Sequence, residues 1–142
     1  MSPILEITLG TDPVPWARTG QGKYGRYTPR KVRDYKNAIA WAICAAYQGP
    51  VIDFGVHVKL RFYFKRPKRL LKKSSPKGPI PHTQKPDEDN LVKAVLDGIS
   101  QSGFWRDDCL VCRKDDAKFF TEIGGKARVE LAVWPVEAMN EN

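Results

Sequence analysis

The sequence predicts a small α+β domain with about four strands and two helices. Strict alternation of apolar and polar residues from Ile52 to Phe64 indicates one long, half-buried strand. An apolar stripe of helical period runs from Leu91 to Ile99, and Gly103 follows it as a stop signal. A chain of 142 residues, 42% of them hydrophobic, suits a single domain over residues 1–142 with one core.

The other elements are a first strand, a first helix and two C-terminal strands, expected over residues 5–9, 28–49, 108–123 and 127–133. Thr28 and Pro29 begin the first helix with a capping hydroxyl and a proline at the first helical position. Gly124 and Gly125 lie between the last two strands, so these strands are predicted to form a hairpin. The tail from about residue 136 is expected to be frayed.

Several classes of protein are excluded by composition. No run is long and apolar enough to span a bilayer, and the first ten residues lack a signal peptide pattern. Three cysteines are too few for a disulfide framework, and the Cys109-x-x-Cys112 pair has no second pair or histidine pair to complete a zinc site. We therefore expect a soluble cytoplasmic protein with reduced thiols and no membrane partner.

The net charge of +8 is unevenly distributed along the chain. Residues 59–77 carry nine Lys or Arg and no acid, whereas twelve of the sixteen acids lie from Asp87 onward. A basic segment separated from an acidic cluster is typical of a protein that holds a polyanion while presenting carboxylates to it. The alternative is a basic domain whose charges are merely solvated.

Two basic loops are predicted, over about 11–28 and 65–86. The first places Trp16 and Tyr24 among arginines and lysines, which can contact phosphates and stack on bases; alternatively it is a flexible surface loop with Trp16 packed on the core. The second is dense in Lys, Arg, Pro and Ser, and we expect it to be mobile and to order on nucleic-acid backbone, unless it is only a linker. The candidate DNA-binding residues are Arg18, Lys23, Arg26, Arg66, Lys68, Arg69, Lys72, Lys73 and Lys85.

Acidic residues flank the second helix at both ends. Asp87 and Asp89 lie at its start, and Asp107 and Asp108 follow Gly103. We expect the fold to bring these carboxylates to one end of the helix, where they can bind Mg²⁺ for phosphodiester hydrolysis. Lys93, one turn after Asp89, would stabilise the transition state.

Two structural explanations compete with this hypothesis. Asp89, Lys93 and Asp97 have the spacing of a surface salt-bridge ladder. Asp87 has the position of a helix cap. In both explanations the acids have no catalytic role.

The motif KPDEDNLVKAVLDGI, followed by GFWRDD, resembles the signature of the RusA family of Holliday junction resolvases. The preceding FKRPKRLLKK, with His82 before Lys85, is similar to that family too. The likeness covers most of residues 62–108. The chain departs from the family pattern at Glu88, where an apolar residue is expected, and this extra charge bears on metal affinity.

This resemblance implies a small mixed sheet packed with two helices, in a homodimer that binds four-way DNA junctions. It implies Mg²⁺-dependent resolution by paired symmetric nicks in recombination and repair, with Mn²⁺ as a substitute metal. By position, the metal ligands and catalytic carboxylates fall on Asp87, Asp89 and Asp108, the essential lysine on Lys93, and Asp107 is a further candidate ligand. Members are often encoded by phages or prophages. The alternative function is that of a noncatalytic basic DNA-binding protein.

Overall fold

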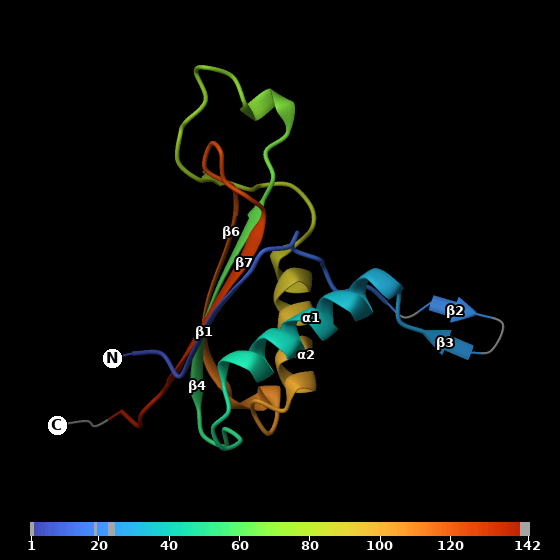
Figure 1. The fold of residues 1–142 in the computed structure, drawn as a ribbon, viewed down its shortest axis with the longest axis vertical. Helices are drawn as coiled ribbons and strands as arrows, with labels where there is room; N and C mark the ends of the chain where they lie inside the picture. Colours follow the sequence, from blue (N-terminus) through green and yellow to red (C-terminus); the bar gives the residue numbers. More distant parts are fainter. Residues whose placement is uncertain (1, 19, 23–24, 140–142) are drawn as a thin grey trace.

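The fold is a five-stranded mixed sheet with two long helices on one face (Figure 1). The computed structural model describes residues 2–18, 20–22 and 25–139. The sheet order is β1-β7-β4-β6-β5, with β1 at Leu5–Leu9, β4 at Val56–Phe64, β5 at Ile80–Pro81, β6 at Val111–Phe120 and β7 at Arg128–Pro135. The predicted α+β class is confirmed. The sheet has one strand more than expected because the two-residue β5 joins its edge beside β6.

The central strand β4 follows the predicted alternation. Val56, Val58, Leu60 and Phe62 are all 0% exposed and face the helices. The strand begins at Val56 rather than at Ile52, which instead forms an isolated parallel bridge with Trp105. Burial of this apolar row anchors the sheet to both helices in one hydrophobic core.

The connection between the last two strands differs from the prediction. β6 and β7 do not form a hairpin, because β4 lies between them and pairs with both. β6 runs parallel to β4, and the chain returns from the end of β4 to the start of β6 through the second long helix, α2 (Glu88–Ser102). The hairpin prediction was wrong because two glycines between strands specify a change of direction but not which strands become neighbours.

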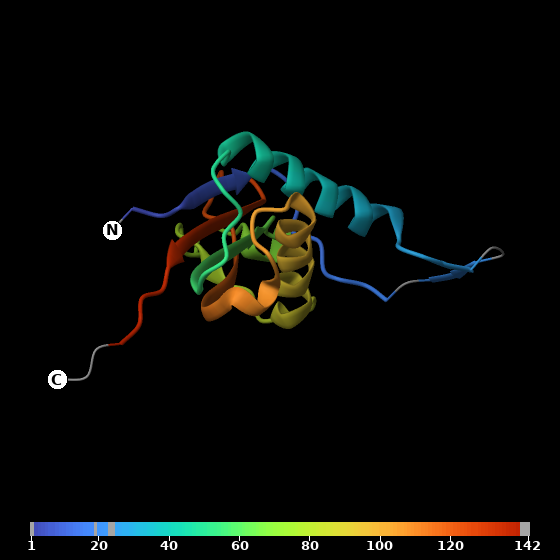
Figure 2. The ribbon, with the colours of Figure 1, turned by 90° about the horizontal axis from the view of Figure 1, so that it is seen from below.

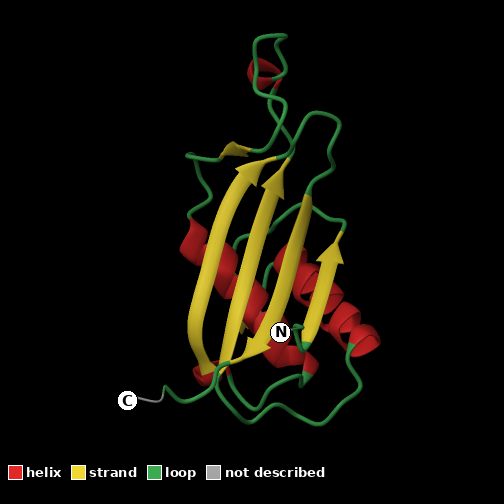
Figure 3. Cartoon of the chain, turned by 90° about the vertical axis from the view of Figure 1, so that its left-hand side faces the viewer, coloured by secondary structure: helices red, strands yellow, loops and turns green. Residues whose placement is uncertain are grey.

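The helices α1 (Arg30–Ala46) and α2 pack against each other and against the same face of the sheet. At their crossing, a Cβ atom on Gly98 would lie 2.9 Å from Ile39 Cβ, so a glycine is required there. Gly103 follows α2 with φ 79°, and it ends the helix as the sequence predicts. Figure 3 shows the opposite face of the sheet, which neither helix covers.

Three segments extend from this body. The strands β2 (Gly20–Gly22) and β3 (Gly25–Tyr27) pair with each other and project beyond the start of α1 (Figure 2). The loop over 65–86 contains a short 3₁₀ helix, Lys68–Leu70, and leads directly into α2 (Figure 1). Residues 136–139 form no regular structure. None of the helices in the described ranges could cross a membrane.

Candidate active site

The acidic start of α2 is free of capping bonds. Asp87 occupies the N-cap position with an extended backbone (φ −66°, ψ 143°), but its side chain makes no capping hydrogen bond. It is exposed, as is Asp89 in the first helical turn. The cap explanation therefore does not account for the Asp87 carboxylate, which remains available to a ligand.

A surface pocket of about 270 Å³ runs along α2 beside the start of β6. It contains three of the predicted site residues, Asp89, Lys93 and Asp108, whereas Asp87 and Asp107 are not among its lining residues. The full lining is Asp89, Val92, Lys93, Leu96, Asp97, Asp108 and Lys114. Carboxylates and ammonium groups thus share one concave surface over an apolar floor.

The carboxylates of this region form two groups rather than one. Because β6 is parallel to β4, the chain that follows α2 returns to the end of the sheet where β4 begins. Asp108 therefore lies beside the C-terminal half of α2. Asp89 lies in the first turn, about 12 Å along the axis from Asp97 at 1.5 Å per residue. The expectation that all the carboxylates meet at one end of the helix is corrected by this topology. In the described part of the chain, no three His, Cys, Asp or Glu side chains are grouped so as to hold one metal ion.

The group at the C-terminal half of α2 contains Asp97, Asp107 and Asp108. Asp108 begins the 3₁₀ helix Asp108–Leu110, and Asp107 precedes it with no capping bond. Hydrogen bonding between the two carboxyl groups raises the pKa of Asp108 and lowers the pKa of Asp107. Partial burial and the charges of Asp107 and Asp97 raise the pKa of Asp108 further. Asp97 is paired with Lys36, but neither Asp107 nor Asp108 forms an ion pair among the described residues, so the charge of these two carboxyl groups favours a cation.

The group at the start of α2 contains Glu88, Asp89 and Asp116. Burial raises the pKa of Glu88, and hydrogen bonding to Asp116 and the charges of Asp116 and Asp89 raise it further. Asp116 lies on the helix-facing side of β6 with a side chain only 10% exposed, and its nearest cation is Lys114 at 3.9 Å. The neighbouring Asp115 lies on the other side of β6, where it is exposed and pairs with Arg61 at 3.0 Å.

The salt-bridge ladder, which was the competing structural explanation for Asp89, Lys93 and Asp97, is not formed among the described residues. Asp97 pairs across the helix interface with Lys36 at 3.3 Å, and no ion pair joins Lys93 to Asp89 or Asp97 in this described region. Instead, the Lys93 Nζ lies 3.6 Å from the centroid of the Trp16 ring. Among the described residues, the contact of the Lys93 ammonium group is therefore an aromatic ring rather than a carboxylate.

A family model for the endodeoxyribonuclease RusA matches residues 11–133, a range that includes α2, both carboxylate groups and the basic loop. The chain belongs to the RusA family. It is also 27% identical over 143 residues to the uncharacterized protein YqaN of Bacillus subtilis (strain 168), covering 94% of this chain and 98% of that protein.

Membership of the RusA family defines the protein as an endodeoxyribonuclease, a Holliday junction resolvase that binds junction DNA in recombination. Nucleases of this family generally depend on divalent metal ions. The pocket along α2 brings together Asp89, Lys93 and Asp108, which all lie within the RusA match. It is therefore the candidate active site.

Most of the predicted DNA-binding residues of this RusA chain are exposed. Arg18 is exposed within the first loop, Arg26 lies in β3, and Lys23 falls outside the described residues. In the second loop, the predicted residues Lys68, Arg69, Lys72, Lys73 and Lys85 are exposed. Their side chains are therefore accessible to a ligand.

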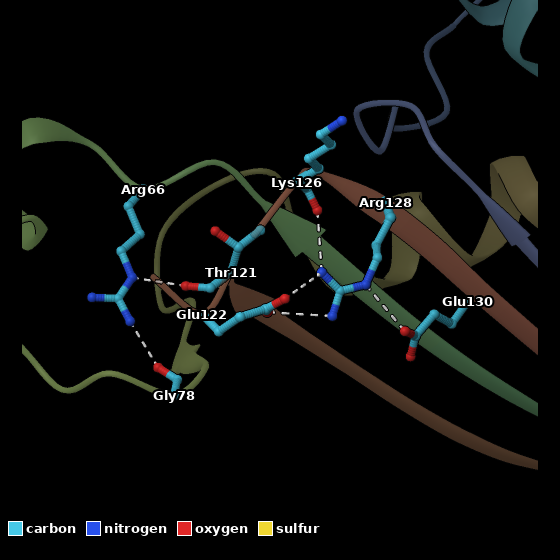
Figure 4. A network of polar contacts seen from close by, with 7 residues as sticks. All are labelled: Arg66, Gly78, Thr121, Glu122, Lys126, Arg128 and Glu130. Atoms are coloured by element: carbon cyan, nitrogen blue, oxygen red, sulfur yellow. Dashed lines mark hydrogen bonds and ion pairs between the residues drawn. The ribbon is translucent and has the colours of Figure 1, made fainter. Parts of the chain in front are cut away.

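Arg66 is the exception. Its side chain is buried, with 5% exposure, and its guanidinium donates to four backbone carbonyls, those of Thr121 at 2.7 Å, Leu70 at 2.9 Å, Pro76 at 2.7 Å and Gly78 at 2.7 Å. Figure 4 shows the bonds to Thr121 and Gly78 beside the Arg128 network. The DNA-binding assignment of Arg66 is corrected, because its donors hold the basic loop to the sheet.

Two charged residues of the pocket, Asp97 and Lys114, were not predicted as part of the site, and neither was Trp16, whose ring contacts Lys93. Asp97 could have been predicted to line the pocket, because it lies four residues after Lys93 and side chains at i and i+4 share a helix face. No local pattern could have found Lys114, because its place in the pocket depends on the parallel pairing of β6 with β4.

Proposed function

We propose that this RusA-family protein is a Mg²⁺-dependent, structure-selective endonuclease that resolves four-way junctions by paired symmetric nicks. The observation that supports this most directly is the α2 pocket, which combines the exposed carboxylates of Asp89 and Asp108 with Lys93, a lysine that makes no ion pair among the described residues. The action is expected in the cytoplasm, on DNA undergoing recombination and repair.

We propose Asp87, Asp89 and Asp108 as the metal ligands, with Asp107 as a further candidate. Their chemistry fits Mg²⁺, which prefers oxygen donors and commonly binds through one or two carboxylates with water completing the shell. The raised pKa of Asp108 supports the assignment, since a bound cation would offset the charges of Asp107 and Asp97. When bound, the ion supplies a nucleophilic water and charge stabilisation at the phosphate, and Mn²⁺ is expected to substitute.

Lys93 is assigned the second catalytic role. It lies between the two carboxylate groups along α2 and lines the same pocket. Its ammonium can donate hydrogen bonds to a phosphate oxygen as negative charge increases there in the transition state. Asp89, Lys93 and Asp108 line one pocket, in which the lysine would act on the phosphate and the carboxylates would hold the metal ion.

The basic loop is assigned the role of gripping the DNA backbone. Replacing Lys68, Arg69, Lys72 and Lys73 together with alanine is expected to weaken junction binding and to reduce the slope of log Kd against log salt by up to about four. The physical reason is that each lost phosphate contact no longer releases a counterion. Titrations of labelled junction at several salt concentrations measure the slope, and an unchanged slope would show that the loop does not touch phosphate.

We further propose a homodimer as the active unit. A four-way junction has approximate two-fold symmetry, and a two-fold dimer places equivalent sites on two opposed strands. Paired symmetric nicks follow from that geometry.

Mapping the nicks tests the proposal. Each strand of a synthetic junction is end-labelled in turn and incubated with the protein in Mg²⁺, in Mn²⁺ or in EDTA. Nicks at equivalent positions of two opposed strands, seen with either metal and lost in EDTA, are expected. Cleavage in EDTA, or nicks on one strand alone, would contradict the metal or the symmetry part of the proposal.

A further inference from the structure

The ammonium group of Lys93 rests on an aromatic ring. Its Nζ lies 3.6 Å from the centroid of Trp16, although carboxylates line the same pocket. Asp97, the acidic residue one turn further along α2, is instead paired with Lys36. The ring is therefore the contact that the structure shows for the Lys93 charge.

Trp16 is held in place by the helix that carries Lys93. Its backbone N–H donates to the carbonyl of Asn90 at 2.8 Å, three residues before Lys93. Its side chain is half-buried against the hydrophobic core, and the neighbouring Pro13 and Val14 are buried too. The ring and the lysine are consequently fixed to the same turn of α2.

A ring differs from a carboxylate as a partner for an ammonium group. The face of an indole attracts a cation through its quadrupole and favours the charged form of lysine. It accepts no strong hydrogen bond, so the three N–H donors of Lys93 remain available to a phosphate oxygen. It also restrains a four-carbon side chain that would otherwise sample many rotamers.

We propose that Trp16 is a positioning residue that holds charged Lys93 in the active-site pocket. This inference rests on the catalytic role proposed for Lys93. Trp16 itself does not act on the phosphate, and its effect on cleavage passes through the lysine.

The test compares Trp16→Leu, which keeps an apolar side chain without a quadrupole, with Trp16→Phe, which keeps an aromatic face. In single-turnover cleavage of a junction, we expect Trp16→Leu to be about tenfold slower, while Trp16→Phe stays within about threefold of wild type. Junction Kd should change less than twofold in both.

A second readout does not depend on activity. In the wild-type protein, NMR signals of the Lys93 side-chain methylene protons should be shifted upfield by the indole ring current, and Trp16→Leu should remove that shift. Trp41→Leu is the matched control, since Trp41 lies on α1 with 78% exposure. It should leave both the shift and the cleavage rate unchanged.

The outcomes separate this inference from the function on which it rests. If Lys93→Met cuts junctions at the wild-type rate, the catalytic role of Lys93 is wrong whatever Trp16 does. If Lys93→Met is inactive but Trp16→Leu cuts normally, only the positioning role is overturned. Absence of the upfield shift in wild type would overturn it as well, without reliance on any variant.

Discussion

Replacing Asp89 with asparagine is expected to abolish junction cleavage while junction binding stays within about threefold of wild type. Asp89 is exposed in the first turn of α2 and lines the pocket that contains Lys93 and Asp108. The amide keeps the shape of the side chain but removes the charge that holds a divalent cation. A metal contributes several kcal/mol of transition-state stabilisation, so cleavage should fall at least about 10³-fold. Gel-shift titration and single-turnover cleavage measure the two effects.

Asp108→Asn should behave in the same way from the other end of the pocket. The matched control is Asp115→Asn, the same change on β6, where the carboxylate pairs with Arg61 on the uncovered face of the sheet. This variant should cut at the wild-type rate. Normal cleavage by Asp89→Asn and Asp108→Asn would remove the pocket from the mechanism.

Replacing Arg66 with alanine is expected to lower the free energy of unfolding by about 3 kcal/mol. Arg66 is buried and donates to four carbonyls, so its loss leaves these acceptors without their charged donor. Junction binding should weaken too, because the basic loop is no longer held beside the sheet. Urea unfolding measures the first effect.

Arg69→Ala is the matched control, because it separates the stabilising role of a buried arginine in this loop from the phosphate-binding role of an exposed one. Arg69 lies exposed in the 3₁₀ helix of the same loop, and its replacement should change the unfolding free energy by less than about 0.5 kcal/mol. It should still weaken phosphate binding. If Arg66→Ala kept wild-type stability and lowered the salt slope instead, Arg66 would be a DNA contact, as its sequence neighbours suggested.

The elements with strong local patterns were predictable. The alternation in β4 and the helical stripe of α2 are both local patterns of apolar residues, and the side of each element that is buried follows from its pattern. Gly103 ends α2 because its backbone is left-handed. The motif from Lys85 to Asp108 indicated the RusA family, to which the chain belongs. These features are encoded within short stretches of sequence.

Features that depend on which strands become neighbours were not predictable in this way. The alternation in β6 and β7 does not specify that β4 lies between them. That pairing places Asp108 beside the C-terminal half of α2 rather than beside its first turn, and it brings Lys114 and Asp116 to the helix side of the sheet. Arg66 was misassigned because a basic composition does not show which guanidinium is buried.

Parallel incubation of an end-labelled four-way junction and a linear duplex of the same sequence, with and without Mg²⁺, tests the central claim most directly. We predict symmetric nicks in the junction alone, and only when Mg²⁺ is present. Equal cutting of the duplex would contradict structure selectivity. A junction that is bound but stays intact in both Mg²⁺ and Mn²⁺ would contradict the proposed metal-dependent mechanism.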